Sequence, residues 1–151
     1  MIYKSEAFWL EYLQMIRDGI TAPLTVTGNS MSPYLIHLRD TVFLSPIREK
    51  PKRGDIVLYR RDNGAYILHR VYRVEKDTWI MVGDAQTVLE TGLREDHLLA
   101  VVTGAERKGR REGPGSFWWE FFRVVWIRMV PHRPVCRKLY GIFAGQKKTE
   151  K

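Results

Sequence analysis

The chain has 151 residues, of which 44% are hydrophobic and 12% aromatic, and a formal net charge of +8. A chain of this length and composition is expected to form one domain with a modest hydrophobic core. Its one cysteine, Cys136, excludes an internal disulfide, and its four histidines show no spacing typical of metal ligands. The sequence also lacks a glycine-rich phosphate loop and low-complexity tracts, so neither a metal nor an organic cofactor is expected.

The positive charge is concentrated toward the C-terminus. Residues 1–104 contain thirteen Lys/Arg and thirteen Asp/Glu, whereas residues 105–151 contain twelve and four. The charged, glycine-containing run at 105–115 is typical of a flexible basic linker. We therefore divide the chain into an N-terminal helix that packs on the core (1–20), the core itself (21–104), this linker, and an aromatic and basic C-terminal tail (116–151).

A helix is predicted from about residue 6 to residue 18, with Ser5 as its N-cap and Gly19 as its stop signal. Apolar residues recur in this segment at helical spacing and give it a broad face for packing on a core. The segment contains four charged residues and is too short to cross a bilayer. It also lacks the basic start and the small-residue cleavage site of a secretory signal.

From Leu24 onward the sequence is dominated by short runs that predict β-strands. Asp62-Asn63-Gly64, between two of these runs, is a strong signal for a β-hairpin. Closely spaced antiparallel strands need a curled sheet or a small barrel to cover their edges. We therefore predict an α+β fold with a mainly antiparallel β core, an N-terminal helix and a C-terminal helical tail. The predicted strands are 24–27, 41–44, 55–60, 66–74, 78–82 and 98–103.

The segment Thr-Gly-Asn-Ser-Met-Ser-Pro at 27–33 is the most informative stretch of the chain. Gly28 and Asn29 are the residue types that most easily adopt positive φ, and Pro33 prevents the preceding strand from continuing. This turn places Ser30 at a strand exit, where its hydroxyl is presented and not buried. Serines in such turns commonly bond only to nearby backbone, so the turn alone does not establish a nucleophile.

Three further segments follow at strand-and-turn spacing: Arg-Gly-Asp-Ile-Val-Leu-Tyr at 53–59, Ile-Leu-His-Arg-Val at 67–71 and Trp-Ile-Met-Val-Gly-Asp-Ala at 79–85. Together with the serine turn they resemble, in order, the four sequence boxes of the type I signal peptidase superfamily of serine proteases. The resemblance covers roughly residues 24–102. His69 stands where the bacterial branch has a lysine, so the chain is similar to the Ser/His branch. Relatives usually have a membrane-spanning segment where this chain has the predicted helix.

The resemblance implies a Ser/His site with Ser30 as the nucleophile and His69 as the general base. A serine hydroxyl needs a positioned base, and an imidazole with a pKa of about 6.5 accepts its proton near neutral pH. Asp84 follows Gly83 where the histidine branch has its aspartate, and would orient the imidazole. From the residues alone, His69 also fits a hydrogen-bonded core histidine and Asp84 a turn aspartate. The asparagine that often follows this aspartate in the family is replaced by Ala85.

The oxyanion of the reaction needs hydrogen-bond donors, and the backbone N–H of Ser30 is the first that we expect. Some relatives use a serine side chain two residues before the nucleophile, but Gly28 stands there in this chain. We therefore expect the second donor at Asn29, with Thr27 or another backbone amide as alternatives.

The tail contains a predicted helix over 117–130, with Ser116 as its cap and Pro131 as its end. It holds three of the five tryptophans together with basic residues, which is typical of a helix at an anionic membrane surface. An alternative is a helix that docks on the sheet and covers its edge. Nucleic-acid binding is less favoured, because the aromatics recur at helical spacing and are not spread over a sheet or groove.

The sequence thus predicts a serine endopeptidase that removes a leader or signal segment from a peptide or protein precursor. We expect it in the cytoplasm or peripherally at the inner membrane surface. A different reading is a non-catalytic module of the same fold that binds peptides or membranes. A self-cleaving, repressor-like domain is a further alternative. It is less favoured, because no helix-turn-helix segment is predicted before the core.

Overall fold

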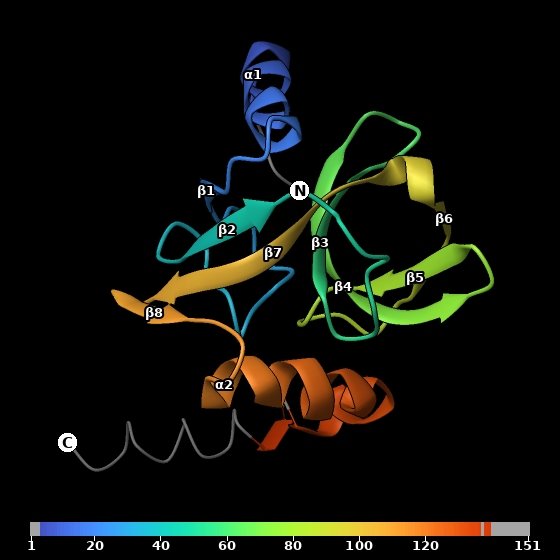
Figure 1. Ribbon diagram of the computed structural model, residues 1–151. Coiled ribbons are helices and arrows are strands. Elements are labelled where there is room, and N and C mark those ends of the chain that lie inside the picture. The colour runs from blue at the N-terminus through green and yellow to red at the C-terminus, as the bar shows by residue number, and fades with distance from the viewer. Residues whose placement is uncertain (1–3, 137, 140–151) are drawn as a thin grey trace.

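The computed structural model describes residues 4–136 and 138–139. Its centre is one antiparallel sheet of eight strands, with a helix at one end and a helical segment beneath it (Figure 1). The predicted α+β class is therefore confirmed. In chain order the elements are α1 (Glu6–Arg17), β1 (Ala22–Thr25), β2 (Thr41–Ser45), β3 (Ile56–Arg60), β4 (Tyr66–Glu75), β5 (Thr78–Val82), β6 (Glu90–Arg94), η1 (Glu95–His97), β7 (Leu98–Arg107), β8 (Arg110–Glu112), α2 (Phe117–Glu120), η2 (Phe121–Val125) and η3 (Trp126–His132).

Helix α1 begins as the sequence predicts. The Ser5 side chain accepts a hydrogen bond from the Phe8 backbone N–H at 3.1 Å, which satisfies one of the unpaired donors of the first turn. The buried face of the helix packs on the sheet, and the Tyr12 hydroxyl donates to the Ala22 carbonyl of β1 at 2.9 Å. The residues buried on this face are Trp9, Tyr12, Leu13 and Ile16.

The strand order is β1-β2-β7-β3-β4-β5-β6, with β8 paired to β7. Strand β7, which comes late in the chain, therefore lies between β2 and β3 and joins the two halves of the sheet. Register shifts interrupt the β2/β7, β3/β7, β4/β5 and β5/β6 pairings. Such irregularities bend strands and increase their twist, and they accompany the curl of the sheet visible in Figure 1.

Two hydrophobic clusters lie on opposite faces of the β3–β4 ribbon. On β3, Leu58 belongs to the larger cluster, with α1 and β1, whereas Val57 belongs to a smaller cluster with β5 and β6. On β4, Leu68 faces the larger cluster and Val71 the smaller one. Because side chains alternate along a strand, neighbouring residues of β4 serve different faces of the sheet.

The structure differs from the sequence prediction at three places in the sheet. Strand β1 begins at Ala22, two residues earlier than expected, and β6 was not predicted because Leu93 is its only buried residue. The segment 105–115, expected to be a flexible linker, contains the end of β7 and all of β8. Lys108 and Gly109 both have positive φ and form the hairpin turn, and the Arg107 side chain binds that of Glu112 at 3.0 Å. The charges that suggested a linker are thus partly paired within a hairpin.

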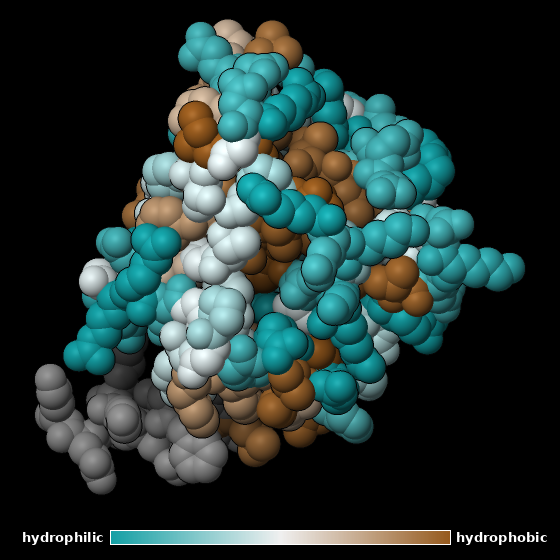
Figure 2. Space-filling view, in the orientation of Figure 1, coloured by the Kyte–Doolittle hydropathy of each residue, from teal (hydrophilic) through white to brown (hydrophobic). Residues whose placement is uncertain are grey.

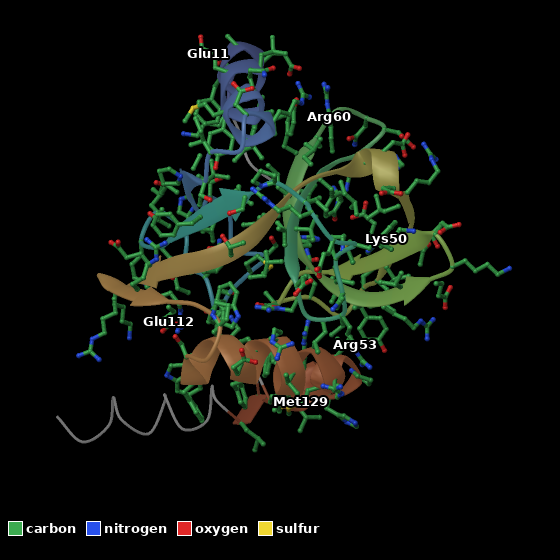
Figure 3. All side chains as sticks on the ribbon, viewed as in Figure 1. Glu11, Lys50, Arg53, Arg60, Glu112 and Met129 are labelled. Carbon is green, nitrogen blue, oxygen red and sulfur yellow. The ribbon has the colours of Figure 1, made fainter. Side chains whose placement is uncertain are left out.

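The C-terminal helical segment, formed by α2, η2 and η3, runs beneath the sheet (Figure 1). It is held there by Phe122, Ile127 and Val130, which are buried, so one side of the segment docks on the core. Arg53 lies at the end of the sheet that faces this segment, which carries Met129 (Figure 3). A Cβ atom on the adjacent Gly54 would overlap the Arg123 carbonyl.

The other side of this segment is apolar and exposed. Phe117 is 72% exposed and Trp118 49%. Figure 2 shows apolar residues along the lower edge of the molecule, over the helical segment. Within the described part of the chain, no helix combines the length and the apolar character that crossing a bilayer requires.

Candidate active site

A buried ion pair between Arg70 and Asp84 lies where the sequence boxes meet. The Arg70 Nε and Nη2 atoms each donate to one Asp84 carboxylate oxygen at 2.8 Å, and the two side chains are 3% and 0% exposed. The remaining arm of the guanidinium, Nη1, donates to the Gly54 carbonyl at 2.8 Å. Its plane also lies 5.5 Å from the Tyr34 ring, which follows the serine turn. One side chain thus contacts two of the other boxes and the residue that follows the third.

The serine turn is part of a loop whose ends are closed by backbone hydrogen bonds. Val26 donates to the Asp40 carbonyl at 2.9 Å, and Leu38 donates to the Val26 carbonyl at 2.8 Å. The apolar residues that follow Ser30, namely Met31, Tyr34 and Leu35, are buried in the larger cluster and anchor the loop to the sheet. Ser30 itself remains half-buried in the turn.

The serine turn packs against the loop that follows β5. The Ala85 backbone N–H donates to the Ser30 carbonyl at 2.9 Å. Gly83 is required by this contact, because a Cβ atom there would lie 2.5 Å from the same Ser30 oxygen. The Gly83-Asp84 box therefore has two structural roles. Gly83 leaves space for the serine turn, and Asp84 neutralises the charge of Arg70.

The C-terminal helical segment supports the same loop from the other side. The Trp126 indole N–H donates to the Asp84 carbonyl at 2.9 Å. Arg133 is buried, and its Nη1 donates to the Gly83 and Gln86 carbonyls, both at 2.8 Å. The loop that positions Ser30 is thus held by residues far along the chain.

His69 lies on the smaller-cluster face of β4 and is 4% exposed. Burial lowers its pKa to about 4, while the Glu90 carboxylate acts to raise it and the Arg61 guanidinium to lower it. The imidazole is therefore neutral at physiological pH. It lines a cavity of about 610 Å³ whose wall is formed mainly by residues 85–90.

Ala85 connects the serine turn to the cavity that His69 lines. Ala85, whose N–H holds the Ser30 carbonyl, is part of the cavity wall that also includes His69. Among the described residues, no hydrogen bond joins the Ser30 hydroxyl to the imidazole. Catalytic hydrogen bonds are often long in unliganded enzymes and shorten only when substrate is bound.

Asp84 does not contact His69, in contrast to the triad that the resemblance implies. His69 and Arg70 are neighbours on β4, so their side chains point to opposite faces of the sheet. Asp84 binds Arg70 through both carboxylate oxygens, and therefore lies on the Arg70 side. This carboxylate serves the ion pair and not the imidazole.

The turn leaves donors for an oxyanion. Among the described residues no acceptor takes the backbone N–H of Ser30. The Asn29 carbonyl accepts from the Ser32 backbone N–H and hydroxyl, while the Asn29 side chain is exposed and makes no hydrogen bond within the described chain. The Thr27 hydroxyl is buried and has no partner there either. The arrangement thus offers Ser30 N–H, with Asn29 and Thr27 nearby in sequence.

The sequence did not reveal the polar contacts of His69. The Tyr59 hydroxyl lies 3.2 Å from the imidazole Nδ1 atom and 2.7 Å from Glu90 Oε1. Alternation along β3 places Tyr59 on the His69 face, so the tyrosine could have been found from its strand pattern. Glu90 lies in a strand without a recognisable pattern and gave no signal. No group of side chains suited to a metal ion occurs among the described residues.

The serine turn thus docks on Ala85, which shares a cavity wall with a neutral histidine. The family model described as Peptidase S24-like matches residues 3–102, and the chain belongs to this family. The match ends within β7, so the helical segment that supports the Gly83–Asp84 loop lies outside it. No curated protein matches the chain.

The role of Asp84 can be tested by its amide variant. Asp84→Asn leaves the buried Arg70 charge uncompensated, and we expect a loss of about 3–5 kcal/mol in unfolding free energy. Asp77→Asn is the control, because that carboxylate is 89% exposed in its contact with Lys50, and should change stability by less than about 0.5 kcal/mol. Urea unfolding measures both. Full stability of Asp84→Asn would contradict the structural role.

Proposed function

We propose that the protein is a serine endopeptidase that cleaves a leader or signal segment from a peptide or protein precursor, with Ser30 and His69 as its catalytic dyad. The observation that carries this proposal is the docking of the Ser30 carbonyl on Ala85, in the wall of the cavity that His69 lines. The family relationship supports the peptidase class. His69, which stands where the bacterial branch has a lysine, supports the Ser/His branch.

The reaction follows from the chemistry of these groups. His69 accepts the hydroxyl proton while Ser30 Oγ attacks the scissile carbonyl, and the Ser30 N–H stabilises the resulting oxyanion. The protonated imidazole then gives this proton to the departing amine, which leaves an acyl-enzyme ester. A water molecule, deprotonated by His69, attacks the ester and releases the acid product, and the proton returns to Ser30.

The cavity suits a segment with apolar side chains. Val88 and Leu89 in its wall are exposed apolar residues, whereas Arg61 and Glu90 pair with each other. An extended peptide would place an apolar side chain against the first pair. Leader and signal segments supply such residues, which supports them as substrates over strongly charged peptides.

The exposed side of the C-terminal helical segment supports a peripheral position at the inner membrane surface. Phe117 and Trp118 expose apolar surface, and Arg128 on the same segment is exposed. This combination of apolar, aromatic and basic side chains is typical of helices that lie in a membrane interface.

The catalytic proposal is tested with Ser30→Ala. This variant should lose cleavage of a proteome-derived peptide library, measured by mass spectrometry, because no nucleophile remains. Its thermal midpoint should stay close to that of the wild type, since a half-buried turn hydroxyl contributes little packing. Ser32→Ala in the same turn is the control and should retain cleavage. A folded Ser30→Ala protein with wild-type activity would refute the assignment.

The pH profile tests the base. Because burial lowers the pKa of His69 to about 4, kcat/KM should rise with pH through a limb centred near pH 4 and be level at neutral pH. The free energy of unfolding should also rise with pH between about 4 and 6.5, since the unfolded histidine binds a proton more tightly there. A kinetic limb at or above pH 6.5 would contradict a buried imidazole base.

The two sides of the helical segment predict opposite effects of substitution. Phe117→Ser should weaken salt-sensitive co-sedimentation with anionic vesicles while leaving the melting temperature unchanged. Ile127→Ala should leave vesicle binding intact and cost about 2–5 kcal/mol of stability, because Ile127 is fully buried. Equal vesicle binding by the wild type and Phe117→Ser would contradict the membrane role.

A further inference from the structure

A chain of polar contacts leads from His69 to the opposite edge of the curled sheet. The Tyr59 hydroxyl contacts His69 Nδ1 at 3.2 Å and Glu90 Oε1 at 2.7 Å. Arg61 in turn donates to both Glu90 oxygens, from Nε at 2.9 Å and from Nη2 at 2.8 Å. Strand β6, which carries Glu90, is separated from β3 by two strands in the sheet order. The curl of the sheet brings them together behind the imidazole.

The direction of each hydrogen bond follows from the chemistry of its partners. An ionised carboxylate only accepts, so the Tyr59 hydroxyl donates its single hydrogen to Glu90. The tyrosine oxygen can then only accept from His69, which places the imidazole hydrogen on Nδ1. The other nitrogen, Nε2, is left with its lone pair, as a general base requires.

The pKa shifts of Glu90 and Tyr59 agree with these protonation states. Burial acts to raise the pKa of Glu90, but the hydrogen bonds from Arg61 and Tyr59 outweigh it and lower this pKa, so the carboxylate is ionised. Burial and the neighbouring Glu90 raise the pKa of Tyr59, so the phenol keeps its hydrogen. The charged groups facing His69 are Glu90, which favours the imidazolium, and Arg61, which opposes it.

We propose that Glu90, acting through Tyr59, is the positioning group of the histidine base, in the place that the resemblance gives to Asp84. This inference rests on the proposed peptidase function. Glu90 and Tyr59 hold His69 with its hydrogen on Nδ1, and the carboxylate stabilises the imidazolium formed when Nε2 takes the Ser30 proton. The Tyr59 hydrogen stays on its oxygen throughout, so the step moves one proton only, from Ser30 Oγ to His69 Nε2.

The first test needs no substrate. Long-range ¹H–¹⁵N correlation spectra of the wild-type protein at pH 7 report which nitrogen of His69 carries the hydrogen. We expect it on Nδ1, and a hydrogen on Nε2 would overturn the proposal. In Tyr59→Phe the acceptor is removed, so the hydrogen should move partly to Nε2. Tyr72→Phe is the matched control, because Tyr72 lies on β4 and its hydroxyl makes no hydrogen bond within the described residues; its His69 spectrum should match that of the wild type.

The second test separates charge from geometry. Glu90→Gln keeps an oxygen that accepts from Tyr59 but loses the charge, so the hydrogen should remain on Nδ1 while the His69 pKa measured by NMR falls further. In peptide cleavage, both Tyr59→Phe and Glu90→Gln should lower kcat by about 10- to 100-fold with little change in KM, because the acid–base step is impaired. Glu95→Gln, an exposed carboxylate in η1, should have no effect.

The outcomes distinguish this inference from the proposed function. An unchanged Nδ1 hydrogen in folded Tyr59→Phe, together with wild-type kcat, would reject Tyr59 and Glu90 as positioning residues even if Ser30 is the nucleophile. The expected NMR results in a protein that cleaves no peptide would instead reject the peptidase function and leave the polar chain intact. If Tyr59→Phe fails to fold, the wild-type spectrum and Glu90→Gln still decide the question.

Discussion

The buried pair of Arg70 and Asp84 is the interaction on which the rest of the site depends. A guanidinium removed from water is costly unless its donors and its charge are matched, and here two donors meet a carboxylate and a third meets the Gly54 carbonyl. The pair fixes the position of Asp84 and therefore of the loop after β5. Because Ala85 in that loop binds the Ser30 carbonyl, the position of the nucleophile follows from the ion pair.

Because side chains alternate along β4, two consecutive residues face opposite sides of the sheet and have different roles. Arg70 points to the larger cluster and connects the sequence boxes, whereas His69 points to the smaller cluster and the cavity. A carboxylate that serves one of these residues is poorly placed to serve the other. This geometry accounts for two separate ion pairs on the two faces of one sheet, the buried pair of Asp84 with Arg70 and the partly buried pair of Glu90 with Arg61.

Much of the fold could be predicted from local signals. Three local signals specified backbone structure: the cap at Ser5, the Asp62-Asn63-Gly64 turn and the alternation along β3 to β5. The helix and the strands that they predicted are present in the structure. Strands β6 and β8 were not predicted, because Leu93 is the only buried residue of β6 and because β8 consists of charged residues. Each pairs with the strand that precedes it in the chain, so its place in the sheet is local, but neither has the alternation of apolar residues by which a strand is recognised.

The site was predictable only in part, for the same reason. The turn chemistry of Gly28 and Asn29 identified Ser30, and the neighbouring boxes identified His69 and the Gly83–Asp84 loop. Which carboxylate faces the imidazole depends on how far the sheet curls, and no local pattern encodes the distance between Tyr59 and Glu90. The support of the Gly83–Asp84 loop by Trp126 and Arg133 likewise depends on tertiary docking.

The central claim, that Ser30 is a nucleophile activated by His69, can be measured most directly without knowledge of the natural substrate. The protein is treated with p-nitrophenyl acetate, quenched with acid, and its acetylated residues are mapped by mass spectrometry. The account predicts acetyl transfer to Ser30, at a rate that falls sharply in His69→Ala, with no comparable labelling of Ser32. Absence of acetyl-Ser30 in the wild type, or equal labelling of Ser30 with and without His69, would contradict it.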